Sequence, residues 1–512
     1  MTAGPDPDHD AGRESRRSDF LPRDELKRRA SSGVLIVGTR GAVIALIALI
    51  GQILLARLLV PEDFGAVAVG LATVAFVNLL ADGGLGAALI RRDEAPERKE
   101  LQALTALQIT ETTLIAGVVT ALAPAFGHVG WVTALIVAST PLLAMQIPGR
   151  IVLERALAYR RLAVVEIVQV LVFNIWALAW VLSGAGVWGL ASAPIARSVA
   201  GVLAMAWASP VGVPMPRYSW RRIRALVGFG LRFQAVTGLW LVRQQGLNFV
   251  VAGMSGLSTL GLVSVARRVL EVPHLLFGAL WRVSYPTMSE LVARGERVTS
   301  LVERAVGITA VVAGATLAGI AAAAPGLVPA LFGEPWRDAA VVIPAACLGL
   351  AVAGPVSVAC QGYLYAVGDA TAVLRSGLIQ TATLFAVTMA LLPSLGIVAV
   401  GIGWLVSYLV EAVLLGRATA RTSGSRLLPT LLTPVGSALV AGGAGWLITT
   451  SQGAGLWSGL LGGGSATLLF LGLLGTLNKR LLTETVRFII AAGRATRATR
   501  RTGGDQALDV DR

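Results

Sequence analysis

Two arginines interrupt an apolar stretch that is long enough to cross a bilayer, residues 230–251, with the sequence GLRFQAVTGLWLVRQQGLNFVV. Arg232 and Arg243 are eleven residues apart, about three helical turns, so in a helix their side chains project within about 20° of each other. A guanidinium group stays protonated at physiological pH and offers paired N–H donors to phosphate oxygens. The pair predicts a basic stripe suited to an anionic ligand.

Amide side chains widen this stripe. Gln244 and Asn248 extend the polar arc of the same helix, whereas Leu239 and Phe249 belong to an apolar sector that faces lipid or neighbouring helices. Amides beside guanidinium groups suit hydroxyl-rich ligands, because they both donate and accept hydrogen bonds. The stretch therefore predicts a hydrated cavity that binds an anionic ligand rich in hydroxyl groups.

The next apolar stretch carries Arg267, Arg268, Glu271 and His274 near its middle, and Arg40 lies about a third of the way into the first stretch. Arg267 and Glu271 are at i and i+4, so they either neutralise each other, leaving Arg268 without that partner, or line the cavity. An arginine at the centre of a membrane helix costs roughly 2.5 to 3.5 kcal/mol, so these residues are expected to face a wet interior. The predicted ligand-binding arginines are, in order, Arg243 and Arg268, then Arg232, Arg40 and Arg267.

Acidic side chains also enter the apolar stretches. Glu111 lies near the middle of its stretch and either carries a coupling proton or forms a polar bridge between helices. Glu271 with His274 is a second candidate for ion coupling. Glu166 and Glu411 lie towards the predicted cytoplasmic ends, where we expect them to pair with arginines or with bases of the inner loops.

The composition predicts the class of protein that must hold these residues. Of the 512 residues, 55% are hydrophobic and 14% are charged, and the mean hydropathy is +0.72. Apolar runs of about 20 residues, enough to cross the hydrocarbon layer as helix, recur from Gly33 to Leu477. The predicted fold class is all-α, a polytopic membrane protein with about fourteen transmembrane helices.

The spans group into five predicted segments. These are a disordered basic cytoplasmic leader (1–32), an N-terminal six-helix lobe (33–209), a C-terminal six-helix lobe (225–416), two extra transmembrane helices (429–477) and a basic cytoplasmic tail (478–512). Seven Lys and Arg residues precede residue 33, and eight follow Asn478. Cytoplasmic segments of membrane proteins are enriched in such residues, so we expect both termini in the cytoplasm. The tail is expected either to lie on anionic lipid as a basic amphipathic helix or to be solvated.

Other chemistry has little support in the sequence. The three histidines are scattered, and no Walker motif, nucleophile elbow or zinc signature is present, so we expect no enzyme activity, cofactor or metal. Cys347 and Cys360 fall on different faces of one predicted helix, which indicates neither a disulfide nor a metal site. The net charge of +14 would suit nucleic acid, but the basic residues are distributed as membrane topology requires, so no nucleic-acid partner is expected.

A short internal repeat relates the two predicted lobes. FGAVAV at 64–69 aligns with LGLVSV at 260–265, six spans later, and in both cases a turn leads into a new helix. The spacing predicts two halves of equal topology. Parallel repeats with a cavity at their interface are a transporter design.

These segments also carry a family resemblance. ARLLVPEDFGAVAVG, followed by LLADGGLGAALIRR, resembles the amino-terminal signature of the polysaccharide-transport branch of the multidrug/oligosaccharidyl-lipid/polysaccharide (MOP) exporter superfamily. GLVSVARRVLEVPHLLFGALWRVSYPTMSEL resembles the corresponding segment of the second half. The resemblance implies a two-lobed flippase of the bacterial inner membrane that moves polyprenyl-pyrophosphate-linked oligosaccharide repeat units to the outer leaflet by alternating access.

The resemblance also implies partners and leaves alternatives open. The expected partners are the lipid-linked oligosaccharide, membrane lipids and the polysaccharide polymerase machinery. One alternative is a peptidoglycan-precursor (lipid II) flippase, which also has fourteen spans and a basic cavity. The other is a cation-coupled multidrug exporter of the same superfamily, which needs an acidic centre, whereas the charge within these spans is mainly positive.

Overall fold

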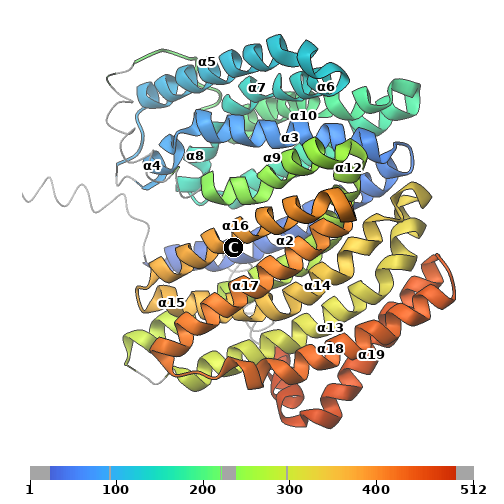
Figure 1. The fold of residues 1–512 in the computed structure, drawn as a ribbon. Helices are drawn as coiled ribbons and strands as arrows, with labels where there is room; N and C mark the ends of the chain where they lie inside the picture. Colours follow the sequence, from blue (N-terminus) through green and yellow to red (C-terminus); the bar gives the residue numbers. More distant parts are fainter. Residues whose placement is uncertain are drawn as a thin grey trace, which may run out of the picture. The chain divides into compact units, whose positions relative to one another are not determined.

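The computed structural model describes residues 23–91, 94–219, 221, 234, 238–295 and 298–491. These residues contain helices and turns and no strand, which confirms the predicted all-α class (Figure 1). The α-helices are α2 (Arg23–Ala56), α3 (Pro61–Asp82), α4 (Leu85–Arg91), α5 (Arg98–Leu122), α6 (Gly127–Val137), α7 (Thr140–Ala144), α8 (Ile147–Arg155), α9 (Tyr159–Trp180), α10 (Val187–Ala208), α12 (Leu247–Ala293), α13 (Thr299–Phe332), α14 (Ala339–Val356), α15 (Gly362–Ala366), α16 (Ala370–Leu395), α17 (Val398–Ser423), α18 (Leu427–Ser451) and α19 (Leu456–Leu477). Short helical turns are η1 (Ala123–Phe126), η2 (Val181–Ala185), η3 (Val242–Gly246), η4 (Glu334–Trp336) and η5 (Ser357–Gln361).

Within the described part of the chain, eleven helical stretches are long and apolar enough to cross a membrane. Two of them, Arg98–Ala144 and Gly238–Ala293, each run through two predicted spans. In the second, Gly256 has φ of 84°, a value that favours glycine, and it interrupts the helical path inside α12. The chain is therefore a multi-pass membrane protein, and the count of fourteen spans stays a prediction.

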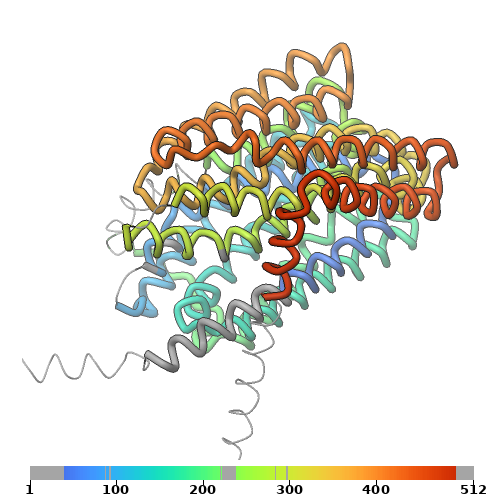
Figure 2. The backbone as a smooth tube through the Cα atoms, turned by 90° about the horizontal axis from the view of Figure 1, so that it is seen from below, coloured from blue at the N-terminus to red at the C-terminus, as the bar shows by residue number. Residues whose placement is uncertain are grey.

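Both predicted tails are partly helical in the structure. Helix α2 begins at Arg23, ten residues before the expected first span, because the sequence RDELKRRASS after Pro22 consists mainly of good helix formers without glycine or proline. At the other end, residues 479–491 form a helix that turns away from α19 at Asn478 (Figure 2). Residues 1–22 and 492–512 lie outside the described residues.

The chain divides into two compact units by its internal contacts. Unit 1 comprises 1–58 and 70–241, and unit 2 comprises 59–69 and 242–512. The predicted lobes, 33–209 and 225–416, divide at different places, because the start of α3 packs with α12 and the predicted seventh span is split at residue 242. The role of these units as transport lobes stays a prediction.

In unit 1, helix α9 packs between α2 and α10, and α5 packs against α6 and α7. One buried cluster joins Leu89, Leu101 and Ile151 from α4, α5 and α8. Another joins Val165 of α9 to Met205 of α10. These apolar contacts hold α8, α9 and α10 together, and those helices carry most of the polar residues of the site described below.

In unit 2, helix α13 lies beside α14, α18 and α19, and α17 packs against α14 and α16 (Figure 1). The fully buried ring of Phe470 on α19 fits against Gly314 of α13, where a Cβ atom would come within 2.7 Å of the ring. Small residues allow such close approach of helices, and packing is the main force between helices in lipid. The last two predicted spans are therefore part of the packed core of unit 2.

The two copies of the sequence repeat meet in one reciprocal crossing within unit 2. A Cβ atom on Gly65 of α3 would lie 1.9 Å from the carbonyl oxygen of Leu257, and one on Gly261 of α12 would lie 1.8 Å from that of Pro61. Each glycine thus faces a carbonyl group of the opposite helix, and that carbonyl group lies four residues before the glycine of its own helix. The aligned positions Pro61 and Leu257 are equivalent in the repeat, so the crossing has local two-fold character.

This crossing predicts a strong sensitivity to added volume. Gly261→Ala places a methyl group against the backbone of α3, so we expect a loss of about 1 to 3 kcal/mol of stability. The measurement is the thermal unfolding temperature of the purified protein in detergent. Gly253→Ala is the matched control, because it lies in the same helix with nothing within 4 Å of its Cβ position. Equal unfolding temperatures for the two variants would contradict the tight crossing.

Candidate functional site

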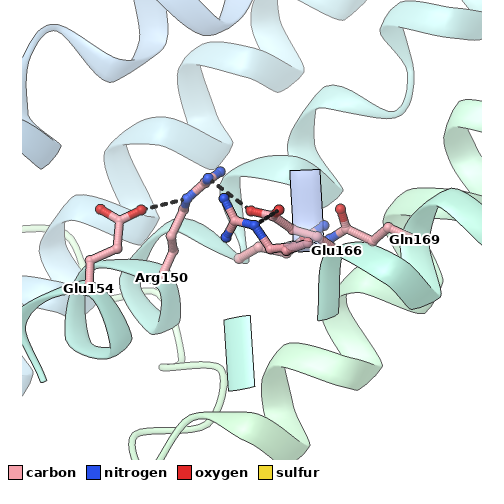
Figure 3. Close-up of polar contacts among 6 residues, drawn as sticks. Arg150, Glu154, Glu166 and Gln169 are labelled. Atoms are coloured by element: carbon pink, nitrogen blue, oxygen red, sulfur yellow. Dashed lines mark hydrogen bonds and ion pairs between the residues drawn. The ribbon is translucent and has the colours of Figure 1, made fainter. Parts of the chain in front are cut away.

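Glu166 of α9 is the centre of a charged cluster in unit 1 (Figure 3). The Nη2 atom of Arg150, on α8, donates to Glu166 Oε1 at 3.3 Å. The Nε atom of Arg40, on α2, lies 3.3 Å from Glu166 Oε2. Two arginines from two different helices therefore share one carboxylate, and Arg197 lies on α10, which packs against α9.

The cluster has more cationic donors than its acids satisfy. Arg150 also pairs with Glu154 on its own helix at 2.9 Å, an exposed contact one helical turn away (Figure 3). The side chain of Arg40 is only 19% exposed, and its Nε and Nη1 atoms are buried without a hydrogen-bond partner among the described residues. Buried guanidinium donors without acceptors are costly. The arrangement favours a further anion.

A chain of buried amides braces this cluster. Gln169, one turn after Glu166, donates through Nε2 to Gln146 Oε1 at 2.6 Å, and Gln146 donates to the carbonyl oxygen of Ser198 at 3.1 Å. Gly201 of α10 leaves the space that the amide pair fills. These bonds fix α9 against α10 next to the residues that carry Glu166 and Arg197.

In unit 2, Arg267 forms hydrogen bonds with two residues of the predicted polar arc. Its Nη1 atom donates to the carbonyl oxygen of Gln244 at 3.0 Å, and its Nη2 atom donates to Asn248 Oδ1 at 2.9 Å. Asn248 Nδ2 in turn donates to Gln245 Oε1 at 3.0 Å. The turn η3 widens the helix there and includes Arg243. The structure thus brings together Arg267, Gln244 and Asn248.

The structure does not form the Arg267–Glu271 pair, which was one of the two alternatives that their i and i+4 spacing left open. Glu271 Oε2 lies 2.6 Å from Nη1 of Arg268, at i and i+3, because Arg267 extends instead towards the polar residues at 244 and 248. Arg268, which we expected to lack this partner, is therefore the neutralised arginine of the two. His274 contacts the carbonyl oxygen of Leu270 through Nδ1 at 2.6 Å.

The remaining predicted site residues are divided between the two units. Glu111 is half-buried on α5 in unit 1, whereas Glu271 and His274 lie on α12 in unit 2. Arg40 belongs to unit 1 and Arg243 to unit 2. Arg232 lies outside the described residues. The predicted site residues that the structure describes thus form one polar set within unit 1 and one within unit 2.

Unit 2 also contains a buried carboxylate that the sequence patterns did not predict as a site residue. Glu411 of α17 is 6% exposed and accepts hydrogen bonds from Gln380 Nε2 at 2.6 Å and from Gln361 Nε2 at 3.3 Å. In the sequence, the glutamines of two neighbouring spans could have indicated partners for Glu411. Their spacing alone does not identify those partners, because the contacts form only when the helices pack together.

Arg150 and Arg197 were also missed as site residues. Arg150 follows the predicted end of a span, where a base is explained by topology alone, and Arg197 was noted within a span without a role. The significance of Arg150 comes from its ion pair with Glu166 of α9, and Arg197 lies on α10, which packs against α9.

Comparisons with known proteins agree with this architecture. Residues 54–341 match the model of a family described as polysaccharide biosynthesis protein. The succinoglycan biosynthesis transport protein ExoT of Rhizobium meliloti (strain 1021) is 26% identical over 336 residues, which are 64% of this chain and 67% of that protein.

Solved structures show the same fold. The lipid II flippase MurJ in an inward closed conformation matches with a TM-score of 0.69 at 12% identity, covering 88% of this chain and 100% of that one. An inward-facing multidrug resistance MATE family transporter of the MOP superfamily matches with a TM-score of 0.58 at 16% identity, covering 74% and 96%. The fold is that of polytopic helical transporters.

The brace beside Glu166 gives a stability prediction. Gly201→Ala would place a Cβ atom 2.4 Å from Gln169 Nε2 and 2.5 Å from Gln146 Oε1, so the buried amide pair must move or break. We expect a loss of about 1 to 3 kcal/mol, measured as a lower thermal unfolding temperature. Gly117→Ala in α5, with nothing within 4 Å, is the control. A Gly201→Ala protein as stable as the control would show that the amide chain is dispensable.

Proposed function

Because the chain belongs to the polysaccharide biosynthesis protein family and is a multi-pass membrane protein, we propose that it is a transporter of the MOP superfamily, a flippase for polyprenyl-pyrophosphate-linked oligosaccharide repeat units. It would move them from the cytoplasmic to the outer leaflet of the bacterial inner membrane for surface polysaccharide assembly. Both termini would lie in the cytoplasm, and the polysaccharide polymerase machinery would receive the product.

The observation that carries this proposal is the guanidinium cluster of unit 1. Arg40 and Arg150 pair with Glu166 of the spanning helix α9, Arg197 lies on the neighbouring spanning helix α10, and Arg40 has buried donors without acceptors among the described residues. A pyrophosphate that crosses the hydrocarbon layer needs such partners, because a desolvated dianion is prohibitively unstable. Guanidinium groups bind phosphate oxygens through paired donors and remain charged.

The polar set of unit 2 supports the saccharide part of the proposal. Gln244 and Asn248 lie together with Arg267, and Arg243 is on the same turn. Such amides and guanidinium groups suit sugar hydroxyls and phosphate oxygens. The prenyl tail would stay in lipid while the headgroup passes between gates that open alternately. Glu111, Glu271 and His274 remain our candidates for coupling transport to an ion gradient.

Charge separates this proposal from the multidrug alternative. A carrier of cationic drugs needs an uncompensated acid, whereas Glu166 and Glu411 are each held by cationic or amide donors. The lipid II alternative shares the pyrophosphate and differs in the sugar. Only a substrate assay separates those two flippases.

We expect depletion of the protein to raise lipid-linked oligosaccharide in the cytoplasmic leaflet, measured by its accessibility to a membrane-impermeant glycan probe in oriented vesicles. Wild type should restore flipping. Arg40→Ala combined with Arg197→Ala should reduce the rate more than about tenfold, because two charge-assisted contacts to phosphate are lost. Arg243→Ala combined with Arg268→Ala tests the arginines that the sequence ranked first.

Arg294→Ala is the matched control, because its side chain is 62% exposed at the end of α12 and pairs with Glu290. It should flip lipid at the wild-type rate. Accumulation of lipid II instead would favour the peptidoglycan-precursor flippase. Unchanged lipid carriers together with altered resistance to cationic drugs would overturn the proposal in favour of the exporter.

A further inference from the structure

The position of Glu166 is unusual for an acid that only fixes topology or packing. Its two oxygens are contacted separately, Oε1 by Arg150 and Oε2 by Arg40, each at 3.3 Å. One carboxylate thus bridges guanidinium groups from different helices. A bound phosphate would use the same donors in the same way.

The contacts of Glu166 are loose for charge-assisted pairs. Hydrogen bonds between guanidinium and carboxylate usually measure about 2.7 to 2.9 Å, and Arg150 makes a 2.9 Å contact of this kind with Glu154. At Glu166, the Arg40 Nε atom is close to the carboxylate without forming a hydrogen bond. The arginines near Glu166 therefore retain donor capacity for a stronger acceptor.

Resting on the proposed function, we propose that Glu166 is an internal counter-anion that the pyrophosphate of the substrate displaces. In the empty protein it neutralises part of the positive charge of the arginine cluster, in which Arg40 is largely buried. When substrate arrives, the phosphate oxygens take over Arg40 and Arg150. When substrate leaves, Glu166 returns, because a tethered anion has a high effective concentration.

This competition has a consequence for transport. A cluster of free guanidinium groups would bind pyrophosphate tightly and release it slowly. An anion that competes for the same donors weakens binding in both leaflets and speeds release. Glu166 is thus a positioning residue that sets the lifetime of the bound state without making a lasting contact with substrate.

The test is the affinity of inorganic pyrophosphate for the purified full-length protein in nanodiscs, measured by isothermal titration calorimetry. Glu166→Gln removes the competing charge and keeps the shape, so we expect about tenfold tighter binding, the size of a typical coupling between two ligands. Glu154→Gln is the matched control, since it removes an acid that pairs with the exposed side of Arg150. It should change the affinity less than about twofold.

Two further measurements keep the outcome decisive. Glu166→Asp keeps the charge but is one methylene too short to bridge both arginines, so it should bind pyrophosphate more tightly than wild type and less tightly than Glu166→Gln. It serves in place of Glu166→Gln if that variant does not fold, which its thermal unfolding temperature shows. In the leaflet assay, Glu166→Gln should flip lipid more slowly despite its tighter binding.

Unchanged or weaker pyrophosphate binding by Glu166→Gln would overturn the inference and leave Glu166 as a permanent structural ion pair. Absence of pyrophosphate binding in every variant would also overturn it. The flippase proposal has its own readout, because it fails only if wild type does not move lipid-linked oligosaccharide. The two failures are therefore distinguishable.

Discussion

The structure depends on one constraint, which is that guanidinium groups within membrane helices must have partners. Desolvating a charge costs several kcal/mol even after relaxation, so each arginine needs a carboxylate, an amide, a carbonyl oxygen or water. The chain meets this need in different ways. Arg267 uses a carbonyl and an amide oxygen, Arg268 uses Glu271, and Arg40 with Arg150 shares Glu166. The shared carboxylate is the arrangement that leaves donors for a ligand.

The constraint acts through helix packing, because the partners come from different helices. Arg40, Arg150 and Glu166 meet only if α2, α8 and α9 keep their places, and the buried amides of Gln146 and Gln169 hold the last of these against α10. Helices in lipid gain little from hydrophobic burial, so close packing and polar bridges set their positions. The functional charges and the structural amides therefore belong to one polar interior.

Much of the fold follows from the sequence because lipid imposes it. Apolar runs of about 20 residues must become helices, so the all-α class could be predicted without knowing a single contact. The repeat also carried three-dimensional information, since Gly65 and Gly261 meet in a reciprocal crossing. The division into units was harder to predict, because the first turns of α3 pack with α12 across nearly two hundred residues of chain.

The site could be predicted only in part, because its side chains contact residues of other helices and the sequence does not show which helices are neighbours. Helical periodicity placed Gln244 and Asn248 on the polar arc of Arg232 and Arg243, whereas the structure joins them to Arg267 of the next predicted span, Gln244 through its backbone carbonyl. The same periodicity left open whether Glu271 pairs with Arg267, and the structure pairs it with Arg268, because spacings of three and four residues both allow contact on one helix. Glu166 gains its significance from α2 and α8, which no periodicity within α9 encodes. Sequence patterns thus locate charges along a helix, whereas packing between helices decides which charge is left for a ligand.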